Sequence, residues 1–136
     1  PLPSDANDFY PDGSIHTNSE DLTKFLLDMM KGAKGQSNTL FSKEGYDLLF
    51  DALLPNGVTP ATVGDNQGIF WVLKDGKIMH NGSDPGTTCG LQFQQTGDSG
   101  YILLTNMDAT IGEHLSNWTN LSTKVDAAVS EFIQAN

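Results

Sequence analysis

The sequence predicts an α+β fold in which an antiparallel sheet is flanked by helices. Two early segments carry apolar residues at helical spacing, and a third such segment closes the chain. Between them lies a stretch rich in β-branched and aromatic residues and interrupted by turn dipeptides, which is typical of a meander of strands. The predicted order is helix, helix, four strands, helix, and a chain of 136 residues has the size of one domain.

The first helix is predicted over residues 18–31. The motif Thr17-Asn18-Ser19-Glu20 has the spacing of a capping box, in which the Thr17 hydroxyl accepts an early helix N–H and Glu20 reaches back. Gly32 stands where a helix stops. The apolar residues at helical spacing are Leu22, Phe25, Leu26 and Met29.

A second helix is predicted after Ser42, whose side chain suits an N-cap. The run Pro55-Asn56-Gly57 ends this helix, and residues 58–66, which are small and polar, are expected to form a loop. The apolar face of the helix comprises Tyr46, Leu49, Phe50 and Leu53.

The pattern then changes to that of strands. Residues 68–73 predict the first strand, and Asp75-Gly76 is a strong signal for a two-residue hairpin. Lys77 to His80 is the predicted return strand, and the segment Asn81 to Gly86, rich in turn formers, is predicted to be a loop.

Two more strands and a helix complete the prediction. The third strand is expected over residues 89–95 and the fourth over residues 101–105, with a turn at Gly97-Asp98 between them. Residues 122–135 carry an apolar face at helical spacing and predict the last helix.

The charge balance argues against two classes of partner. The chain has 17 acidic residues against 7 basic ones, a formal net charge of −10. Nucleic acids and anionic membrane surfaces both bind basic patches, so neither is expected as a partner. No apolar run approaches the roughly 20 residues that cross a bilayer, so no membrane span is expected.

The composition predicts no disulfide within the chain and no metal or cofactor. Cys89 is the only cysteine, and its place in a predicted strand suggests a small core residue. The three histidines, His16, His80 and His114, lie far apart and lack the close spacing of metal ligands. His16 and His114 are interpreted as ordinary residues of a loop and a helix.

The densest candidate for chemistry is the run from His80 to Gly86. Gly82 leaves no side chain where the strand is predicted to end, so a ligand could approach the backbone closely. Exposed N–H groups there could hold a developing oxyanion. A plain strand-to-loop turn explains the same residues, so both interpretations stay open.

The run Met79 to Gly86 resembles the third signature of the β-lactamase and penicillin-binding family. That family has Lys-Thr-Gly there, and many esterase and peptidase relatives have His-x-Gly. Residues 12–26 are similar to the entry into a helix of the family's all-helical region. Residues 68–71 and 101–106 are similar to the strands before and after the third signature, so the resemblance covers residues 9–135.

Two motifs of that family are missing from the chain. Family catalysis needs Ser-x-x-Lys, in which the serine attacks the carbonyl and the lysine helps to take its proton. No serine here has a lysine three positions later, and neither Tyr-x-Asn nor Ser-x-Asn occurs. In the family both motifs lie upstream. We therefore interpret residues 1–136, which begin with Pro1 rather than Met, as a single partial domain, the C-terminal segment of such a hydrolase.

The resemblance implies a parent protein that hydrolyses an ester, a D-alanyl peptide or a β-lactam through an acyl-serine. His80, standing where lactamases have lysine, would orient or protonate the substrate, which favours an ester or peptide over a β-lactam. The backbone N–H of Ser83 would be an oxyanion donor, and Asn81 and Gly82 would border the substrate. The implied partners are a small-molecule or peptide substrate and the upstream segment.

The resemblance also implies a bacterial protein in the periplasm or outside the cell. A rival interpretation is a non-catalytic binding or interaction module that is complete in itself, with a structural or partner-binding glycine-rich run. A third is an accessory fragment that pairs with an upstream polypeptide.

Overall fold

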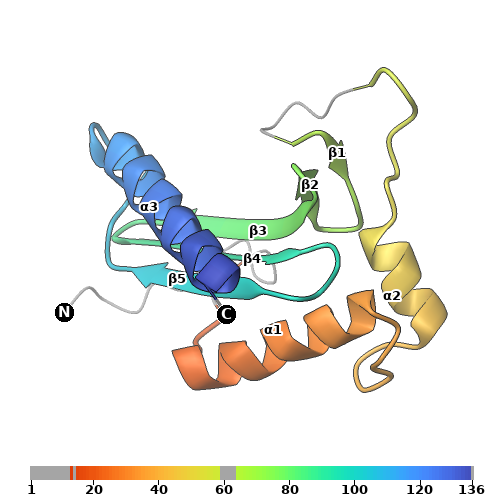
Figure 1. Cartoon of the computed structure of the whole chain (residues 1–136). Coiled ribbons are helices and arrows are strands. Elements are labelled where there is room, and N and C mark those ends of the chain that lie inside the picture. The colour runs from red at the N-terminus through yellow and green to blue at the C-terminus, as the bar shows by residue number, and fades with distance from the viewer. Residues whose placement is uncertain (1–12, 14, 59–63, 136) are drawn as a thin grey trace.

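The computed structural model describes residues 13, 15–58 and 64–135. Within these residues the chain forms three helices and one five-stranded antiparallel sheet, which confirms the predicted α+β class (Figure 1). The strand order is β1-β2-β3-β4-β5. The elements are α1 (Ser19–Ala33), α2 (Lys43–Phe50), β1 (Asn66–Gln67), β2 (Val72–Lys74), β3 (Lys77–Asp84), β4 (Thr87–Gln94), β5 (Gly100–Thr105) and α3 (His114–Ala135).

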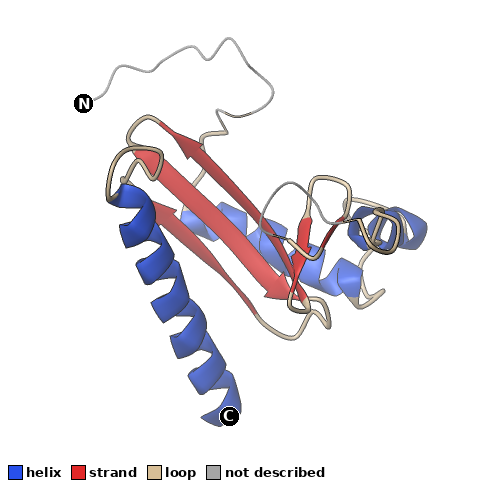
Figure 2. Ribbon diagram, turned by 90° about the horizontal axis from the view of Figure 1, so that it is seen from above, coloured by secondary structure: helices blue, strands red, loops and turns tan. Residues whose placement is uncertain are grey.

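The sheet is the middle of three layers. Figures 1 and 2 show α1 on one face of the sheet and α3 crossing the other. On the α3 face, Lys77 Nζ of β3 and Gln92 Nε2 of β4 donate to the Asp126 carboxylate of α3 at 2.6 and 2.7 Å. These two hydrogen bonds fix the helix across both central strands.

The hydrophobic core lies on the other face, between the sheet, α1 and α2. Ile78 of β3 and Phe93 of β4 form a cross-strand pair and are 0% and 1% exposed. The Phe93 ring meets those of Phe50 and Trp71 edge to face at 5.6 and 5.8 Å, an arrangement that stabilises aromatic clusters. The buried core residues are Leu26, Met29, Tyr46, Phe50, Trp71, Ile78 and Phe93.

Helix α1 is present as predicted, but its cap differs. Asn18, rather than Thr17, is the N-cap: its Oδ1 accepts the Asp21 N–H at 2.9 Å. Asn caps a helix at least as well as Thr, so the cap lies one residue later and the predicted Thr17–Glu20 capping box is wrong.

Helix α2 begins at the predicted cap, where the Ser42 Oγ accepts the Gly45 N–H at 3.2 Å. It ends at Phe50, so Leu53 lies outside it, contrary to the prediction. The Leu53 N–H instead donates to the Gln67 carbonyl of β1 at 3.0 Å, which an α-helical conformation at Leu53 would prevent.

Tyr46 joins α1 to α2. Its ring is fully buried and its hydroxyl donates to the Asp28 carboxylate of α1, which also accepts a hydrogen bond from Ser37. Burial alone would raise the pKa of Asp28, but the hydrogen bonds from Ser37 and Tyr46 outweigh it and hold the pKa below its ordinary value.

The first predicted strand, residues 68–73, is mostly wrong. A turn occupies residues 68–71, closed by the Gly68 N–H to the Trp71 carbonyl at 2.8 Å, and the strand begins only at Val72. The Ile69 N–H donates to the Leu49 carbonyl of α2 at 3.1 Å, so a tertiary contact overrides the strand propensity of this segment. The expected loop over residues 58–66 lies partly outside the described residues, and Asn66 belongs to β1.

The hairpin prediction at Asp75-Gly76 is confirmed. Both residues have positive φ, 50° and 71°, as a two-residue turn of this type requires. The predicted loop from Asn81 to Gly86 is wrong, because β3 continues to Asp84 and only Pro85 and Gly86 turn. Gly86 takes φ 80°, so two residues suffice to reverse the chain and both strands extend.

The rest of the chain follows the prediction with one extension. Strands β4 and β5 match the predicted third and fourth strands to within two residues. Helix α3 begins at His114, eight residues before the predicted start at Ser122. Trp118 lies in this extra part and packs over Gly90 of β4, where an added Cβ would be 3.3 Å from the indole. The early turns of α3 therefore follow from packing on the sheet.

Candidate functional site

The candidate site is the half of β3 that has only one neighbouring strand. Pairing between β2 and β3 ends at Val72 and Met79. From His80 to Asp84, which we call the open end of β3, β4 is the only strand among the described residues that pairs with it. The sequence-predicted residues His80, Asn81, Gly82 and Ser83 all lie in this open end.

The direction of the backbone groups at the open end follows from the alternation of an antiparallel ladder. The Gln94 N–H of β4 donates to the Ser99 carbonyl at 2.8 Å, so Gln94 faces β5. In a central strand the backbone N–H and C=O groups of successive residues point to opposite neighbouring strands. Those of Cys89 therefore point to β3, where Cys89 and Gly82 form a hydrogen-bonded pair. The N–H and C=O groups of Asn81 and Ser83 therefore point away from β4, toward the open edge.

His80 lies on the core face of the sheet, two residues beyond the buried Ile78. Its side chain is exposed, and its ring meets the edge of the Trp71 ring at a centroid distance of 6.1 Å. Trp71 is only 6% exposed, so it gives His80 a fixed neighbour. An exposed imidazole beside the open edge is able to take part in proton transfer.

Gly82 differs from the other glycines with described surroundings. An added Cβ would lie 3.6 Å from the Cys89 Sγ, an ordinary contact, and its φ lies outside the left-handed region. Left-handed φ requires glycine at 35, 57, 76, 97 and 112, and a contact of 3.3 Å or less constrains glycines 32, 45, 64, 68, 90 and 100. Neither the backbone nor the packing therefore requires glycine at position 82.

The Ser83 side chain serves the fold. Its Oγ lies 2.8 Å from the Thr88 Oγ1, and Thr88 is 2% exposed. The same Thr88 oxygen accepts the Ala109 N–H at 2.9 Å, so the hydroxyl chain ties the hairpin to the segment after β5. This leaves the backbone N–H of Ser83, rather than its hydroxyl, as the group available to a ligand.

The segment after β5 is held by Asp108. The Thr110 hydroxyl and backbone N–H donate to its carboxylate at 2.5 and 2.9 Å. These hydrogen bonds, with a further one from the Gly86 backbone, hold the pKa of Asp108 below its ordinary value. Asp108 therefore stays ionised at neutral pH and fixes the turn beside the open end of β3.

The other residues weighed from the sequence do not join the open end as reactive groups. His16 is exposed before α1, and the His114 Nδ1 lies 3.0 Å from the Asp108 carbonyl at the start of α3. Cys89 is half-buried, unpaired with any other cysteine, and lies opposite Gly82. Among the described residues, no three His, Cys, Asp or Glu side chains gather that could hold a metal ion.

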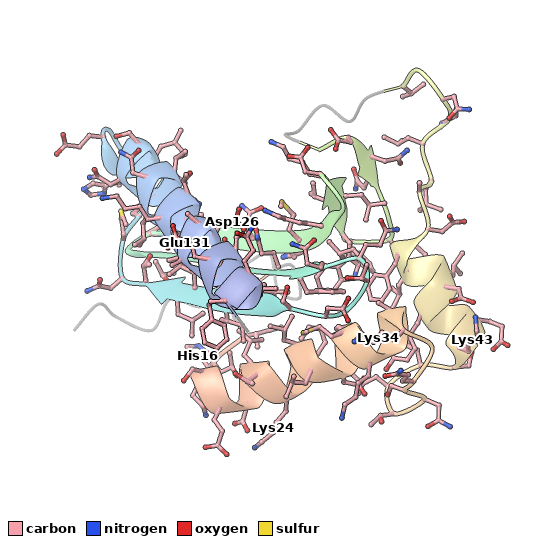
Figure 3. The ribbon with its side chains drawn as sticks, in the orientation of Figure 1. His16, Lys24, Lys34, Lys43, Asp126 and Glu131 are labelled. Carbon is pink, nitrogen blue, oxygen red and sulfur yellow. The ribbon has the colours of Figure 1, made fainter. Side chains whose placement is uncertain are left out.

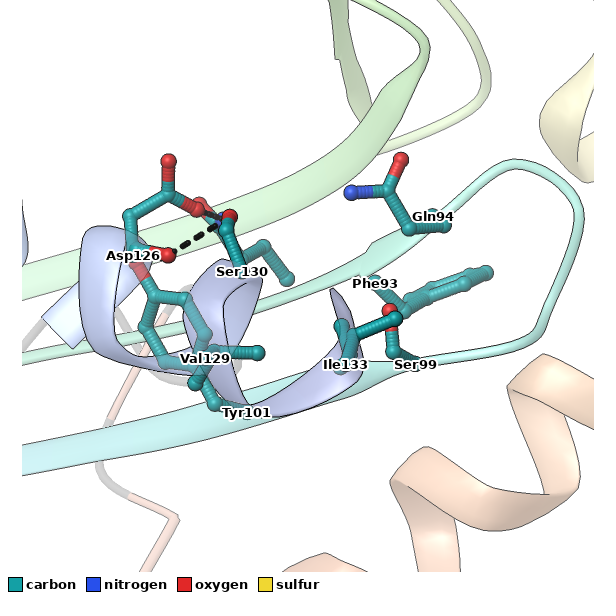
Figure 4. A pocket seen from close by; sticks show the side chains of 10 residues that line it. Phe93, Gln94, Ser99, Tyr101, Asp126, Val129, Ser130 and Ile133 are labelled. Atoms are coloured by element: carbon teal, nitrogen blue, oxygen red, sulfur yellow. Dashed lines mark hydrogen bonds between the residues drawn. The ribbon is translucent and has the colours of Figure 1, made fainter. Parts of the chain in front are cut away.

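Two of the cavities formed by the described residues lie away from the open end of β3. One of about 10 Å³, the size of a water site, lies between α3, β4 and β5 (Figure 4). Tyr101 and Asp126 line it, and burial together with the Asp126 charge raises the pKa of Tyr101 to about 12. The other, about 500 Å³ and open to solvent, is lined by residues of α2 and by Ile78 and Gln95. Residues 80–83 line neither cavity.

Acids neutralise much of the positive charge on the surface. Lys24 contacts Glu20 and Asp21, Lys34 contacts Asp98, and Lys43 contacts Asp47, all with exposed or half-buried side chains. Figure 3 shows Lys24 on α1, Lys34 directly after the end of α1, Lys43 at the start of α2 and Asp126 on α3. In the part of the chain that the structure describes, no helix is long and apolar enough to cross a membrane.

The sequence located the candidate residues but missed the feature that makes them accessible. It placed residues 81–86 in a loop, whereas the relevant geometry is a strand with a free edge. It also missed that the turn at residues 68–71 borders this edge. The missed signal was the combination of Pro85 and Gly86, which allows a hairpin as readily as a loop.

A scan against protein-family models and searches of curated proteins and of solved structures match nothing to this chain.

Proposed function

We propose that this chain supplies one wall and one oxyanion donor of the active site of a β-lactamase-like serine hydrolase. The parent protein hydrolyses an ester, a D-alanyl peptide or a β-lactam through an acyl-serine. An upstream segment carries the nucleophile, so the chain is inactive alone.

The single observation that carries this proposal is the free backbone edge beside a glycine that the fold does not need. A serine attacking a carbonyl carbon converts the carbonyl oxygen to an oxyanion, which needs preorganised N–H donors. The Ser83 N–H points out of the sheet edge, where it is available as one donor. The second donor would be the backbone N–H of the nucleophile itself.

Gly82 has a clear role under this proposal. A substrate lying along the open edge passes the backbone next to Ser83, where a side chain at position 82 would obstruct it. Since the fold leaves room for a Cβ at this position, its absence is explained by a ligand rather than by packing.

His80 completes the wall. It is exposed, it precedes the free edge, and Trp71 limits the directions its ring can take. We assign it the orientation or protonation of the substrate. An imidazole stands here in place of the lysine that lactamases have at the resembling position, and this favours esters or peptides over β-lactams as substrates.

The experiment compares the isolated chain with the parent polypeptide that includes its upstream segment. We expect the isolated chain to hydrolyse neither nitrocefin nor p-nitrophenyl esters, and the parent to hydrolyse at least one of them. Replacing the serine of an upstream Ser-x-x-Lys with alanine should abolish that activity. Saturable turnover by the isolated chain, lost on replacing one of its own serines, would overturn the proposal, as would a parent without Ser-x-x-Lys.

The same open edge supports a second candidate, a binding module. An extended peptide can add a strand to a free sheet edge through backbone hydrogen bonds, and Asn81 and Ser83 both present an N–H and a C=O for this. Micromolar binding of extended peptides by the isolated chain, together with a parent that lacks Ser-x-x-Lys, would favour this candidate. Hydrolysis by the parent would favour the first.

A further inference from the structure

The most unusual residue near the open end of β3 is Phe70. Its φ is 64°, in the left-handed region that bulky side chains rarely adopt. Its side chain is 79% exposed, the highest value after Ile15 among the large apolar residues that the structure describes. The chain thus holds an aromatic ring in solvent on a strained backbone, and such strain is typical of functional sites.

The turn that carries Phe70 is firmly anchored. The Gly68 N–H closes it onto the Trp71 carbonyl at 2.8 Å, and the Ile69 N–H donates to the Leu49 carbonyl of α2 at 3.1 Å. An added Cβ at Gly68 would lie 2.4 Å from that carbonyl oxygen, so the turn sits directly on the end of α2. The ring of Phe70 is therefore presented from a fixed backbone.

The register places this turn beside the open edge. Val72 pairs with Met79, so Trp71 stands next to His80, as their ring contact at 6.1 Å confirms. Phe70 is one residue further along, where β2 leaves the sheet and the unpaired edge of Asn81 begins. The turn that carries Phe70 thus borders the start of the free edge at Asn81, and the Ser83 N–H lies two residues further along that edge.

We propose that Phe70 selects the substrate of this site by packing against an apolar acyl or aryl group attached to the carbonyl. This inference rests on the proposed function, because it takes the Ser83 N–H as the donor to that carbonyl. Phe70 is a specificity residue: it contacts the apolar part of the ligand and takes no part in bond making. The substrate class is then an ester or amide with an apolar acyl group longer than acetyl.

The test measures binding of neutral carbonyl compounds to the isolated chain by NMR. Acetamide, butanamide and hexanamide are uncharged, so the net charge of −10 does not repel them. We expect all three to shift the Ser83 amide resonance. Affinity should rise roughly twofold for each added CH₂, about half of the effect of full burial in free-energy terms, because the ring covers one side only.

Phe70→Gly is the decisive variant. Glycine adopts φ 64° without strain, so the thermal midpoint should stay the same or rise. Acetamide binding should persist, and the dependence on chain length should disappear. Phe70→Leu should keep part of that dependence. Phe132→Ala on α3, where the ring is 70% exposed, is the matched control and should leave it unchanged.

The outcomes separate the two proposals. If chain-length dependence survives in Phe70→Gly while the Ser83 amide still shifts, the role of Phe70 is wrong and the site itself stands. A marked fall in the thermal midpoint of Phe70→Gly would show a structural ring and also refute the selective role. If none of the amides shifts the Ser83 resonance, the proposed site fails, and this inference fails with it.

Discussion

The two halves of strand β3 both pair with β4 on one side, but they differ in what lies on the other side. The first half, Lys77 to Met79, lies between β2 and β4, and its central residue Ile78 is fully buried. Within the described part of the chain, the second half, His80 to Asp84, pairs with β4 alone and is exposed except at Gly82, which is half-buried. The first half, closed on both sides, holds the fold together, and the second, open half offers free backbone groups.

The difference shows how a short neighbouring strand creates a site. Strand β2 is only three residues long, because the turn at residues 68–71 is held by α2. If β2 continued along β3, the outward-pointing N–H and C=O groups of Asn81 and Ser83 would form hydrogen bonds with it. The contact of the turn with α2 therefore leaves the edge free, and the closed half supplies a rigid base for it.

The largest expected effect concerns the closed half. Phe93→Ala should lower the free energy of unfolding by about 3–5 kcal/mol, since it removes a ring that is 1% exposed and contacts two other aromatic rings. Urea unfolding followed by circular dichroism measures this. Leu104→Ala in β5, where the side chain is 43% exposed, is the control and should cost far less. Equal losses would contradict the placement of the core.

The next effect concerns the open half and appears in activity. Gly82→Val in the parent protein should lower kcat by on the order of 10²-fold, the scale seen on loss of one oxyanion donor. Its thermal midpoint should change little, because the position is a strand with room for a Cβ. Lys74→Val introduces the same side chain at the end of β2, away from the open half of β3, and is the control. A folded Gly82→Val variant with near-normal kcat would exclude the oxyanion role.

A smaller effect links the core that packs against the closed half to pH. Tyr46→Phe removes the hydroxyl that donates to Asp28 and should lower the free energy of unfolding by about 1.5 kcal/mol at neutral pH. The folded-state pKa of Asp28 is lowered, so this stabilisation is present above the unfolded pKa, about 4, and is lost as the pH falls through the folded value.

Urea unfolding of the wild type and Tyr46→Phe between pH 7 and pH 2 measures this dependence. The difference between the two proteins should be constant down to about pH 4 and shrink below it, as Asp28 takes up its proton. A difference that does not change over the whole range would mean that the hydroxyl stabilises the fold without the charge on Asp28.

The sequence predicted the elements better than their ends. The periodicity around Leu26 and Met29 and the Asp75-Gly76 turn are local signals, and both predictions are confirmed. The first strand failed because the bond from Ile69 to Leu49 of α2 is a tertiary contact with no local signature. The early start of α3 was missed for a similar reason, since Trp118 packs on a strand distant in sequence.

In the candidate site, too, the sequence predicted the residues with a local signal but not the features that depend on tertiary contacts. Sequence alone marked His80 and Gly82 as residues of interest, and the structure places both in the open end of β3. The free edge depends on where β2 stops, which the residues of β3 do not encode. The exposure and the positive φ of Phe70 could not be predicted either. A strand through residues 68–73 would have given Phe70 an ordinary φ and placed its side chain on the face of the sheet opposite to that of Trp71.

The smallest expected effect tests the argument that the fold does not require glycine at position 82. Gly82→Ala in the isolated chain should raise the free energy of unfolding by about 0.5 kcal/mol, because alanine restricts the unfolded chain and fits the native φ. Gly90→Ala is the matched control on the paired strand: its Cβ would lie 3.3 Å from the Trp118 indole, so it should bring no gain or a loss. Thermal unfolding of both variants measures this. If Gly82→Ala destabilises as much as Gly90→Ala does, the fold itself requires the glycine, and its absent side chain no longer points to a ligand. If stability rises while the same change impairs hydrolysis by the parent, then position 82 trades stability for access to the free edge of β3.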